Sequence, residues 1–100
     1  MINVEKLYYA LFFDDWKSRI SDQETKKIRK AISNLLEREK IVIENRFALI
    51  NPLTLNETGK LIWARNLKRN YVSRERVRQI EANAIRKLRN FLCQDQQTKI

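Results

Sequence analysis

The spacing of apolar residues predicts a chain built almost wholly from helices. Apolar side chains recur every three or four positions in stretches at about 3–20, 21–35, 37–48 and 54–64, and again in a longer stretch at 72–92. Such spacing places apolar residues on one face of an α-helix. The chain of 100 residues contains one Gly and one Pro, which also favours helix. We therefore expect an all-α fold, one small domain of four to five helices.

The stretch at 72–92 shows the clearest pattern. Ser73 can cap the start of a helix, and Glu75 puts a carboxylate in its first turn, where the helix dipole favours negative charge. With no Gly or Pro inside it, the stretch predicts one helix of about five turns. One face of this helix is apolar: Val77, Ile80, Ala84, Leu88 and Phe91. The opposite face carries Glu75, Arg78, Gln79, Ala82, Arg86 and Arg89.

The polar face of this helix has the chemistry of a DNA-reading surface. Arginine can bind guanine through two hydrogen bonds, glutamine can bind adenine in the same way, and glutamate accepts from the cytosine amino group. Ala82 is small enough to permit close approach. The alternative is a charged helix face that meets only solvent, which is the common fate of charge runs.

Two capping boxes precede this helix, the first at Ser21 and the second at Thr54. Ser21 and Glu24 match the S-x-x-E capping box and predict the start of a second helix, although periodicity does not show whether that helix continues into residues 37–48. Nothing between these stretches breaks a helix strongly, so both arrangements stay open.

A helix-turn-helix is indicated by the residues after Pro52, the firmest helix stop in the chain. Thr54 and Glu57 form a further capping box, which predicts a helix from about residue 54 with Leu55, Thr58, Leu61 and Ile62 facing inward. Gly59 lies inside this helix, where glycine costs stability relative to alanine. It is tolerable where another backbone approaches closely, as in the first helix of a helix-turn-helix.

The joint at residues 63–71 is longer and more basic than a plain helix-turn-helix requires. We expect the first helix to extend to about Leu67, followed by a turn around residues 68–70; the alternative is a protruding basic loop. In either case its cations could add DNA contacts: Arg65, Lys68 and Arg69.

The N-terminal stretch holds many of the aromatic residues at helical spacing: Val4, Leu7, Tyr8, Leu11, Phe12, Trp16 and Ile20. Such a stripe usually forms core. A second interpretation is a docking surface for a partner protein, because exposed aromatic patches mark interfaces.

Charge favours a polyanionic partner. Residues 1–52 carry 10 Lys/Arg and 8 Asp/Glu, whereas residues 53–100 carry 11 and 4, so most of the net charge of +9 accompanies the DNA-reading helix. Cys93 is the only cysteine and there is no histidine, which excludes a disulfide framework and the usual zinc sites and removes the commonest general base. We expect no enzyme activity, no metal or other cofactor and no small-molecule substrate. No long apolar run or signal peptide is present, so we expect a cytoplasmic protein without membrane contact.

Five segments together resemble region 4 of bacterial sigma-70-type RNA polymerase sigma factors. They are residues 35–39 (LLERE), 43–47 (IENRF), 53–60 (LTLNETGK), 73–82 (SRERVRQIEA) and 85–89 (IRKLR). The resemblance implies a domain that recognises the promoter −35 element of double-stranded DNA and docks on the β flap of core RNA polymerase. The chain departs from the family pattern at Ala48, where a glycine is usual, and in the joint before Ser73, which is about eight residues longer.

The resemblance also assigns roles to individual residues. Arg74, Glu75 and Gln79 match its base-reading positions. Positions expected at the DNA backbone are Ser73, Arg76, Arg78, Arg86, Lys87 and Arg89. Base contacts would supply specificity, and phosphate contacts would supply affinity and salt dependence.

The predicted organisation is an N-terminal helical extension at 1–34, a region-4-like helix-turn-helix domain at 35–92 and a frayed tail at 93–100. Residues 1–34 match no other sigma region, so the chain is either a fragment of a full sigma factor or a stand-alone region-4-like protein, and we expect the stand-alone protein. The leading function is specific DNA binding in transcription initiation or its regulation. The alternative is a protein-interaction module that docks on RNA polymerase or on a sigma-factor partner without specific DNA binding of its own.

Overall fold

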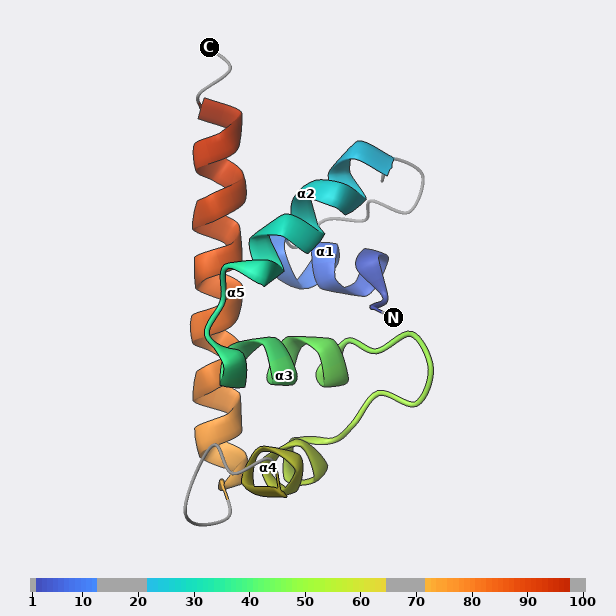
Figure 1. Cartoon of the computed structure of the whole chain (residues 1–100), viewed down its shortest axis with the longest axis vertical. Helices are drawn as coiled ribbons and strands as arrows, with labels where there is room; N and C mark the ends of the chain where they lie inside the picture. Colours follow the sequence, from blue (N-terminus) through green and yellow to red (C-terminus); the bar gives the residue numbers. More distant parts are fainter. Residues whose placement is uncertain (1, 13–21, 65–71, 98–100) are drawn as a thin grey trace.

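The computed structural model describes residues 2–12, 22–64 and 72–97. Within these ranges the chain forms five α-helices (Figure 1): α1 (Val4–Phe12), α2 (Asp22–Ser33), α3 (Glu37–Arg46), α4 (Leu55–Ala64) and α5 (Arg74–Gln97). The predicted all-α fold class is confirmed. None of the described helices is long and apolar enough to cross a membrane.

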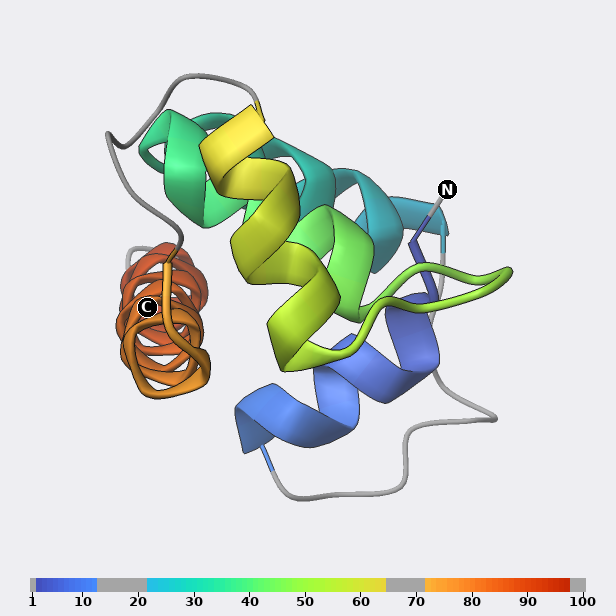
Figure 2. The ribbon, with the colours of Figure 1, turned by 90° about the horizontal axis from the view of Figure 1, so that it is seen from below.

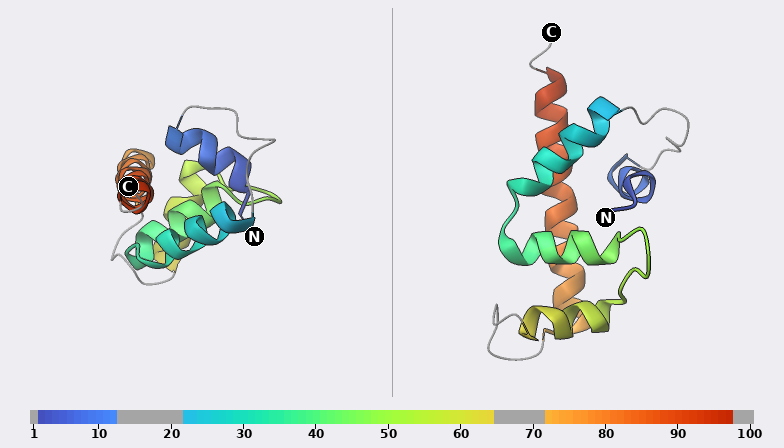
Figure 3. Two further views of the ribbon diagram at one scale, coloured as in Figure 1. Left: turned by 90° about the horizontal axis from the view of Figure 1, so that it is seen from above. Right: turned by 45° about the vertical axis from the view of Figure 1, so that its right-hand side comes forward.

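Helix α5 is the axis on which the other helices are arranged. Its 24 residues extend over about 36 Å at 1.5 Å per residue. Helices α3 and α4 cross its N-terminal half, and α1 and α2 pack toward its C-terminal half (Figures 1 and 3). Seen along its axis in Figure 2, all four other helices lie on the same side of α5. One long side of α5 is therefore not covered by another described helix.

The covered side of α5 is the predicted apolar stripe. Val77, Ile80, Ala84 and Leu88 are buried, and Phe91 is half-buried against the same packing. These residues divide between two apolar clusters. We call the cluster around the C-terminal half the larger core: Leu7, Tyr8, Leu11, Ile28, Ala31, Ile32, Leu35, Ile43, Phe47, Ala84, Leu88 and Leu92. The smaller core, around the N-terminal half, consists of Ile41, Val42, Ile62, Val72, Val77 and Ile80.

Helices α2 and α3 are separate, which answers the question that periodicity left open. The break follows Ser33, and α3 begins after Leu36, whose backbone N–H donates to Glu39 Oε1 at 2.9 Å. The expected cap at Ser21 lies outside the described residues. Helix α3 ends at Arg46, close to the predicted end at residue 48.

The segment between α3 and α4 is held at both ends. Leu53 N–H donates to the Asn45 carbonyl at 2.9 Å, and Asn3 N–H donates to the Phe47 carbonyl at 2.7 Å. Ala48 forms an isolated antiparallel bridge with Ile2, and the left-handed residue of this segment is Asn51 (φ 54°), directly before the proline. The sigma pattern has a glycine at position 48. In this chain the left-handed residue is instead Asn51, three positions later, and asparagine tolerates the left-handed conformation well.

Two predictions concern the ends of helices. Helix α5 continues to Gln97, five residues into the stretch expected to form a frayed tail. Helix α4 is described to Ala64. The predicted extension to Leu67 and the turn at 68–70 lie outside the described residues, as do Arg65, Lys68 and Arg69. The predicted N-terminal helix over 3–20 is described only as α1, since residues 13–21 are also outside.

Candidate nucleic-acid interface

The start of α4 confirms the predicted capping box. Thr54 N–H donates to Glu57 Oε1 at 2.9 Å, and Glu57 N–H donates to Thr54 Oγ1 at 3.2 Å. The pKa of the Glu57 carboxyl is lowered from its usual value, most by the hydrogen bond from Thr54 N–H and next by the Thr54 hydroxyl. The side chain of Thr58 is fully buried and its hydroxyl donates to the Thr54 carbonyl at 2.8 Å. The first turn of α4 is thereby fixed on both its solvent and core sides.

Gly59 is the contact point between α4 and the start of α5. A Cβ at this position would overlap the carbonyl oxygen of Val72 and lie 3.4 Å from Val77 Cγ2. The predicted close approach of a second backbone is therefore present, and only glycine leaves room for it. This approach fixes the angle at which α5 leaves α4, as a helix-turn-helix requires.

Helix α5 begins as predicted. The Ser73 hydroxyl accepts from Arg76 N–H at 3.1 Å, and the Ser73 carbonyl accepts from Val77 N–H at 2.9 Å. Ser73 is thus the N-cap, and it satisfies one of the free amides at the positive end of the helix dipole.

The first three turns of α5 expose a polar face opposite the smaller core. The exposed residues are Arg74, Glu75, Arg78, Gln79, Ala82, Asn83 and Arg86. All three predicted base-reading residues belong to this face, and Ala82 lies within it. Because the covering helices lie on the other side of α5, the face is open to a large partner.

Two side-chain pairs, each three residues apart, organise this face. Arg78 grips Glu75 through two hydrogen bonds, Nε to Oε2 at 3.0 Å and Nη2 to Oε1 at 2.6 Å. Beside them, Arg76 Nη1 donates to Gln79 Oε1 at 3.3 Å. The hydrogen bond from Arg78 lowers the pKa of Glu75, and the same bond raises the pKa of Arg78. Glu75 therefore remains a charged acceptor across the neutral pH range.

The structure separates the predicted DNA-backbone residues into two groups. Arg86 is exposed on the open face. Lys87 instead pairs with Glu39 of α3 at 2.9 Å, where the carboxylate side chain is only 5% exposed, and Arg89 donates to the carbonyl of Leu11 at the end of α1 at 2.7 Å. Lys87 and Arg89 thus hold neighbouring helices against α5. No local sequence pattern predicts these contacts, because the partners are 48 and 78 residues away.

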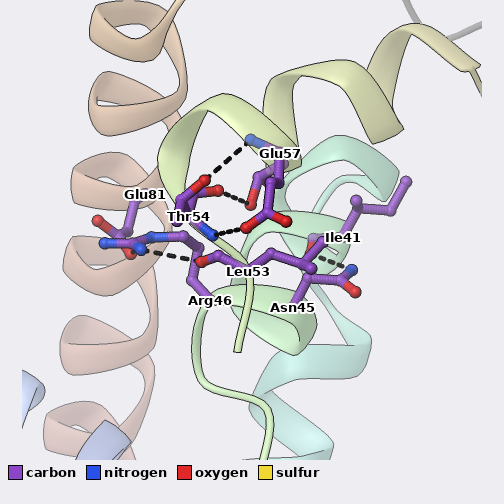
Figure 4. Close-up of polar contacts among 8 residues, drawn as sticks. Ile41, Asn45, Arg46, Leu53, Thr54, Glu57 and Glu81 are labelled. Atoms are coloured by element: carbon purple, nitrogen blue, oxygen red, sulfur yellow. Dashed lines mark hydrogen bonds and ion pairs between the residues drawn. The ribbon is translucent and has the colours of Figure 1, made fainter. Parts of the chain in front are cut away.

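We did not predict from the sequence a set of hydrogen bonds made by the Arg46 side chain, which we call the Arg46 bracket. Figure 4 shows its guanidinium between α5 and the segment that leads into α4. Nε donates to Glu81 Oε1 at 3.0 Å, and Nη1 donates to the Leu53 carbonyl at 3.0 Å. Asn45, the preceding residue, accepts from Leu53 N–H and donates to the Ile41 carbonyl at 2.7 Å. The Arg46 side chain thus connects the end of α3 to the segment before α4 and to the second turn of α5.

The described residues contain no group of three or more His, Cys, Asp or Glu side chains able to hold a metal ion. The site that the structure offers is a surface of hydrogen-bond donors and acceptors. Its geometry suits a partner that presents base edges or other polar groups in a groove.

Comparison with known proteins relates part of the chain to RNA polymerase sigma factors. The chain is 45% identical over 67 residues to RNA polymerase sigma factor RpoD in each of two strains of Helicobacter pylori. The aligned stretch covers 64% of this chain and 9% of the relative, so the chain spans less than a tenth of the length of the curated relatives it matches. No protein-family model matches the chain. No solved structure matches it. The chain is a partial homologue of sigma factors and contains a sigma-70-like segment.

Proposed function

We propose that this protein binds double-stranded DNA at a promoter −35-like element and acts in transcription initiation or its regulation. The observation that carries the proposal is the open face of α5, where Arg74, Glu75 and Gln79 are exposed together at the end of the helix that α4 supports. The proposed role needs neither catalysis nor a cofactor.

The open face is suited to a major groove. An α-helix fits this groove, and the residues near its N terminus usually reach the base edges. The uncovered side of α5 lets the helix enter without a clash with α1 or α2 (Figure 2). Arg86, one to two turns further along, would contact phosphate, and the free amides at the start of α5 would favour a further phosphate.

Similarity to sigma factors supports the target class. The matched relatives are named RNA polymerase sigma factors, and the motifs at 53–60 and 73–89 resemble region 4 of that family. We infer a region-4-like domain that acts in the cytoplasm on promoter DNA, with core RNA polymerase as its protein partner. The β flap is the docking site that this resemblance implies.

Binding measurements on duplexes test the proposal. Wild-type protein should prefer a −35-like duplex to a random duplex of equal length across a salt series, because base contacts persist while phosphate contacts weaken with salt. Gln79→Ala should relax the preference at one base pair, at a cost of roughly 1–3 kcal/mol. Asn90→Ala, an exposed change later on α5, is the control and should leave binding unchanged. Equal affinity for both duplexes at every salt concentration would refute specific reading.

A second function, docking on RNA polymerase without specific DNA binding, is favoured by two exposed apolar residues. Leu49 is 51% exposed and Ile50 is 77% exposed in the segment between α3 and α4. Helix α1 is less suited to this role than the sequence suggested, because Leu7, Tyr8 and Leu11 are buried in the larger core. Deletion of residues 1–20 would therefore damage the fold as well as any docking.

Surface substitutions give a cleaner test of docking. The double change Leu49→Ser/Ile50→Ser should reduce co-purification with RNA polymerase and leave duplex binding intact. The exposed Tyr9→Ser change on α1 is the matched control for loss of an exposed apolar side chain. If wild-type protein captures no polymerase subunit, the docking function is wrong.

A further inference from the structure

The pair formed by Glu75 and Arg78 places a charged acceptor in a defined position before any DNA is bound. Both side chains are largely exposed, at 62% and 59%, yet two hydrogen bonds join the carboxylate to the guanidinium. Contact at two points restricts the rotation of the carboxylate as well as its distance from the guanidinium. The pair therefore fixes the direction in which the remaining lone pairs of Glu75 point.

We propose that Arg78 is a positioning residue for sequence discrimination: through its two-point grip it holds Glu75 to accept from the amino group of one cytosine. The inference rests on the proposed DNA-binding function and deepens it. It differs from the role that the sigma resemblance implies for Arg78, which is contact with the DNA backbone.

Hydrogen-bond capacity permits the three-part arrangement. A carboxylate has about four acceptor sites, and Arg78 occupies one on each oxygen, which leaves acceptor capacity for a base amino group. Arg78 has about five N–H donors and uses two of them in the bonds to Glu75, so the remaining donors can bind a phosphate or a base. Glu75 does not have to leave Arg78 in order to read DNA.

Electrostatics gives the reason for a positioning cation at this site. A lone carboxylate that enters a groove lined by phosphates is repelled and loses side-chain freedom on binding. The guanidinium offsets the negative charge of Glu75 and has already ordered it. Arg76 and Gln79 repeat the design one residue along the helix, through a longer single contact of 3.3 Å. The Glu75–Arg78 pair is therefore the better test of the principle.

Lysine and arginine substitutions distinguish positioning from simple attraction to phosphate. Arg78→Lys keeps the positive charge but lacks the planar fork. Affinities should be measured for a −35-like duplex and for all its single-base-pair variants, with wild type, Arg78→Lys, Arg78→Ala, Glu75→Ala and the Glu75→Ala/Arg78→Ala double variant. Arg29→Lys is the matched control, because Arg29 is exposed on α2 and lies outside the proposed DNA-binding face.

The expected result is a loss of discrimination at one base pair. Glu75→Ala should abolish a preference of about fivefold or more at that pair. Arg78→Lys and Arg78→Ala should lose most of the same preference and leave the others, and the double variant should lose no more than Glu75→Ala alone. Arg29→Lys should retain all preferences.

Two outcomes would overturn the inference in distinguishable ways. If wild type discriminates at the pair read by Glu75 and Arg78→Lys discriminates equally well, or if Arg78→Ala weakens all duplexes by the same factor, Arg78 acts only on phosphate. If wild type discriminates at no base pair, the proposed function itself is wrong, and this inference is wrong with it.

Discussion

The two halves of α5 are supported in different ways. Around its C-terminal half, the larger core contains twelve of the described buried residues, from α1, α2, α3, α5 and the residues that follow α2 and α3, and Lys87 and Arg89 of this half bond to neighbouring helices. Around its N-terminal half, the smaller core contains six, and polar contacts surround it: the capping box at Thr54, the Gly59–Val72 approach and the Arg46 bracket. Apolar burial is non-directional, whereas hydrogen bonds and close backbone contacts fix angles.

This difference suggests a division of labour along one helix. The larger core contributes most of the free energy of folding because it removes more apolar surface from water. The smaller core and the contacts around it fix the angle between α4 and the start of α5, on which the proposed DNA reading depends. Substitutions in the two halves should therefore separate stability from recognition, and the predictions below follow from the largest expected effect to the smallest.

Leu88→Ala in the larger core should have the largest effect on stability. Leu88 is 1% exposed, and removal of a buried leucine side chain costs about 2–5 kcal/mol. We expect the free energy of unfolding, measured by urea denaturation, to fall by that amount, while any protein that remains folded keeps its DNA preference. A selective loss of base discrimination without loss of stability would contradict the division of labour. Asn90→Ala is the surface control on the same helix.

Gly59→Ala should weaken both stability and recognition. The new Cβ would meet the Val72 carbonyl, so the backbone has to shift, at a cost of about 1–3 kcal/mol for overpacking. Alanine returns about 1 kcal/mol through its higher helix propensity. Because the atom that the Cβ meets belongs to the backbone, which cannot move aside cheaply, the cost of overpacking should exceed the gain in helix propensity, and urea denaturation should show a net loss of stability. Specific duplex affinity should also fall, because α5 changes its angle to α4. Asn56→Ala, exposed on α4, should change neither property.

Arg46→Ala should destabilise the protein less than Leu88→Ala and more than Glu81→Ala. Arg46 and Glu81 are only 28% and 15% exposed, so removal of the arginine leaves the carboxylate and the Leu53 carbonyl without their donor, at about 1–3 kcal/mol. Glu81→Ala leaves Arg46 bonded to the Leu53 carbonyl. Thermal unfolding of the two variants measures the order, and a reversed order would show that the Leu53 contact contributes little.

Features set by neighbouring residues were the ones that the sequence predicted well. The apolar stripe of α5, the cap at Ser73 and the capping box at Thr54 each depend on residues three or four positions apart, and the structure confirms all three. Gly59 was predictable because glycine inside a helix needs a compensating reason, which the Val72 backbone supplies. The exposure of Glu75 and Gln79 followed from the same helical periodicity, whereas Arg74 was assigned through the resemblance to sigma region 4.

Features set by distant residues were not predictable in this way. Arg46 meets Glu81 across 35 residues, and the partners of Lys87 and Arg89 are further still. Helix α3 shows the same limit, because Ile41, Val42 and Ile43 are consecutive and all buried, so no single apolar face could be assigned. The reason is that α3 contributes to both cores. Only the assembled fold reveals which cations remain available on the open face.

The smallest predicted effect is a pH dependence at the capping box of α4. The pKa of Glu57 is lowered in the folded protein, chiefly by the Thr54 N–H bond, so the cap contributes stability that is present above the pKa of the unfolded chain, about 4.3, and is lost as pH falls through the folded value. The stability difference between wild type and Glu57→Ala should therefore be constant from pH 7 to about pH 5 and shrink in more acidic solution.

Glu57→Gln is the matched control, because its amide can still accept from Thr54 N–H but does not titrate. Its stability difference from Glu57→Ala should stay constant over the same range. If wild type and Glu57→Gln lose stability in parallel below pH 4, the acid sensitivity of the protein arises at other carboxylates.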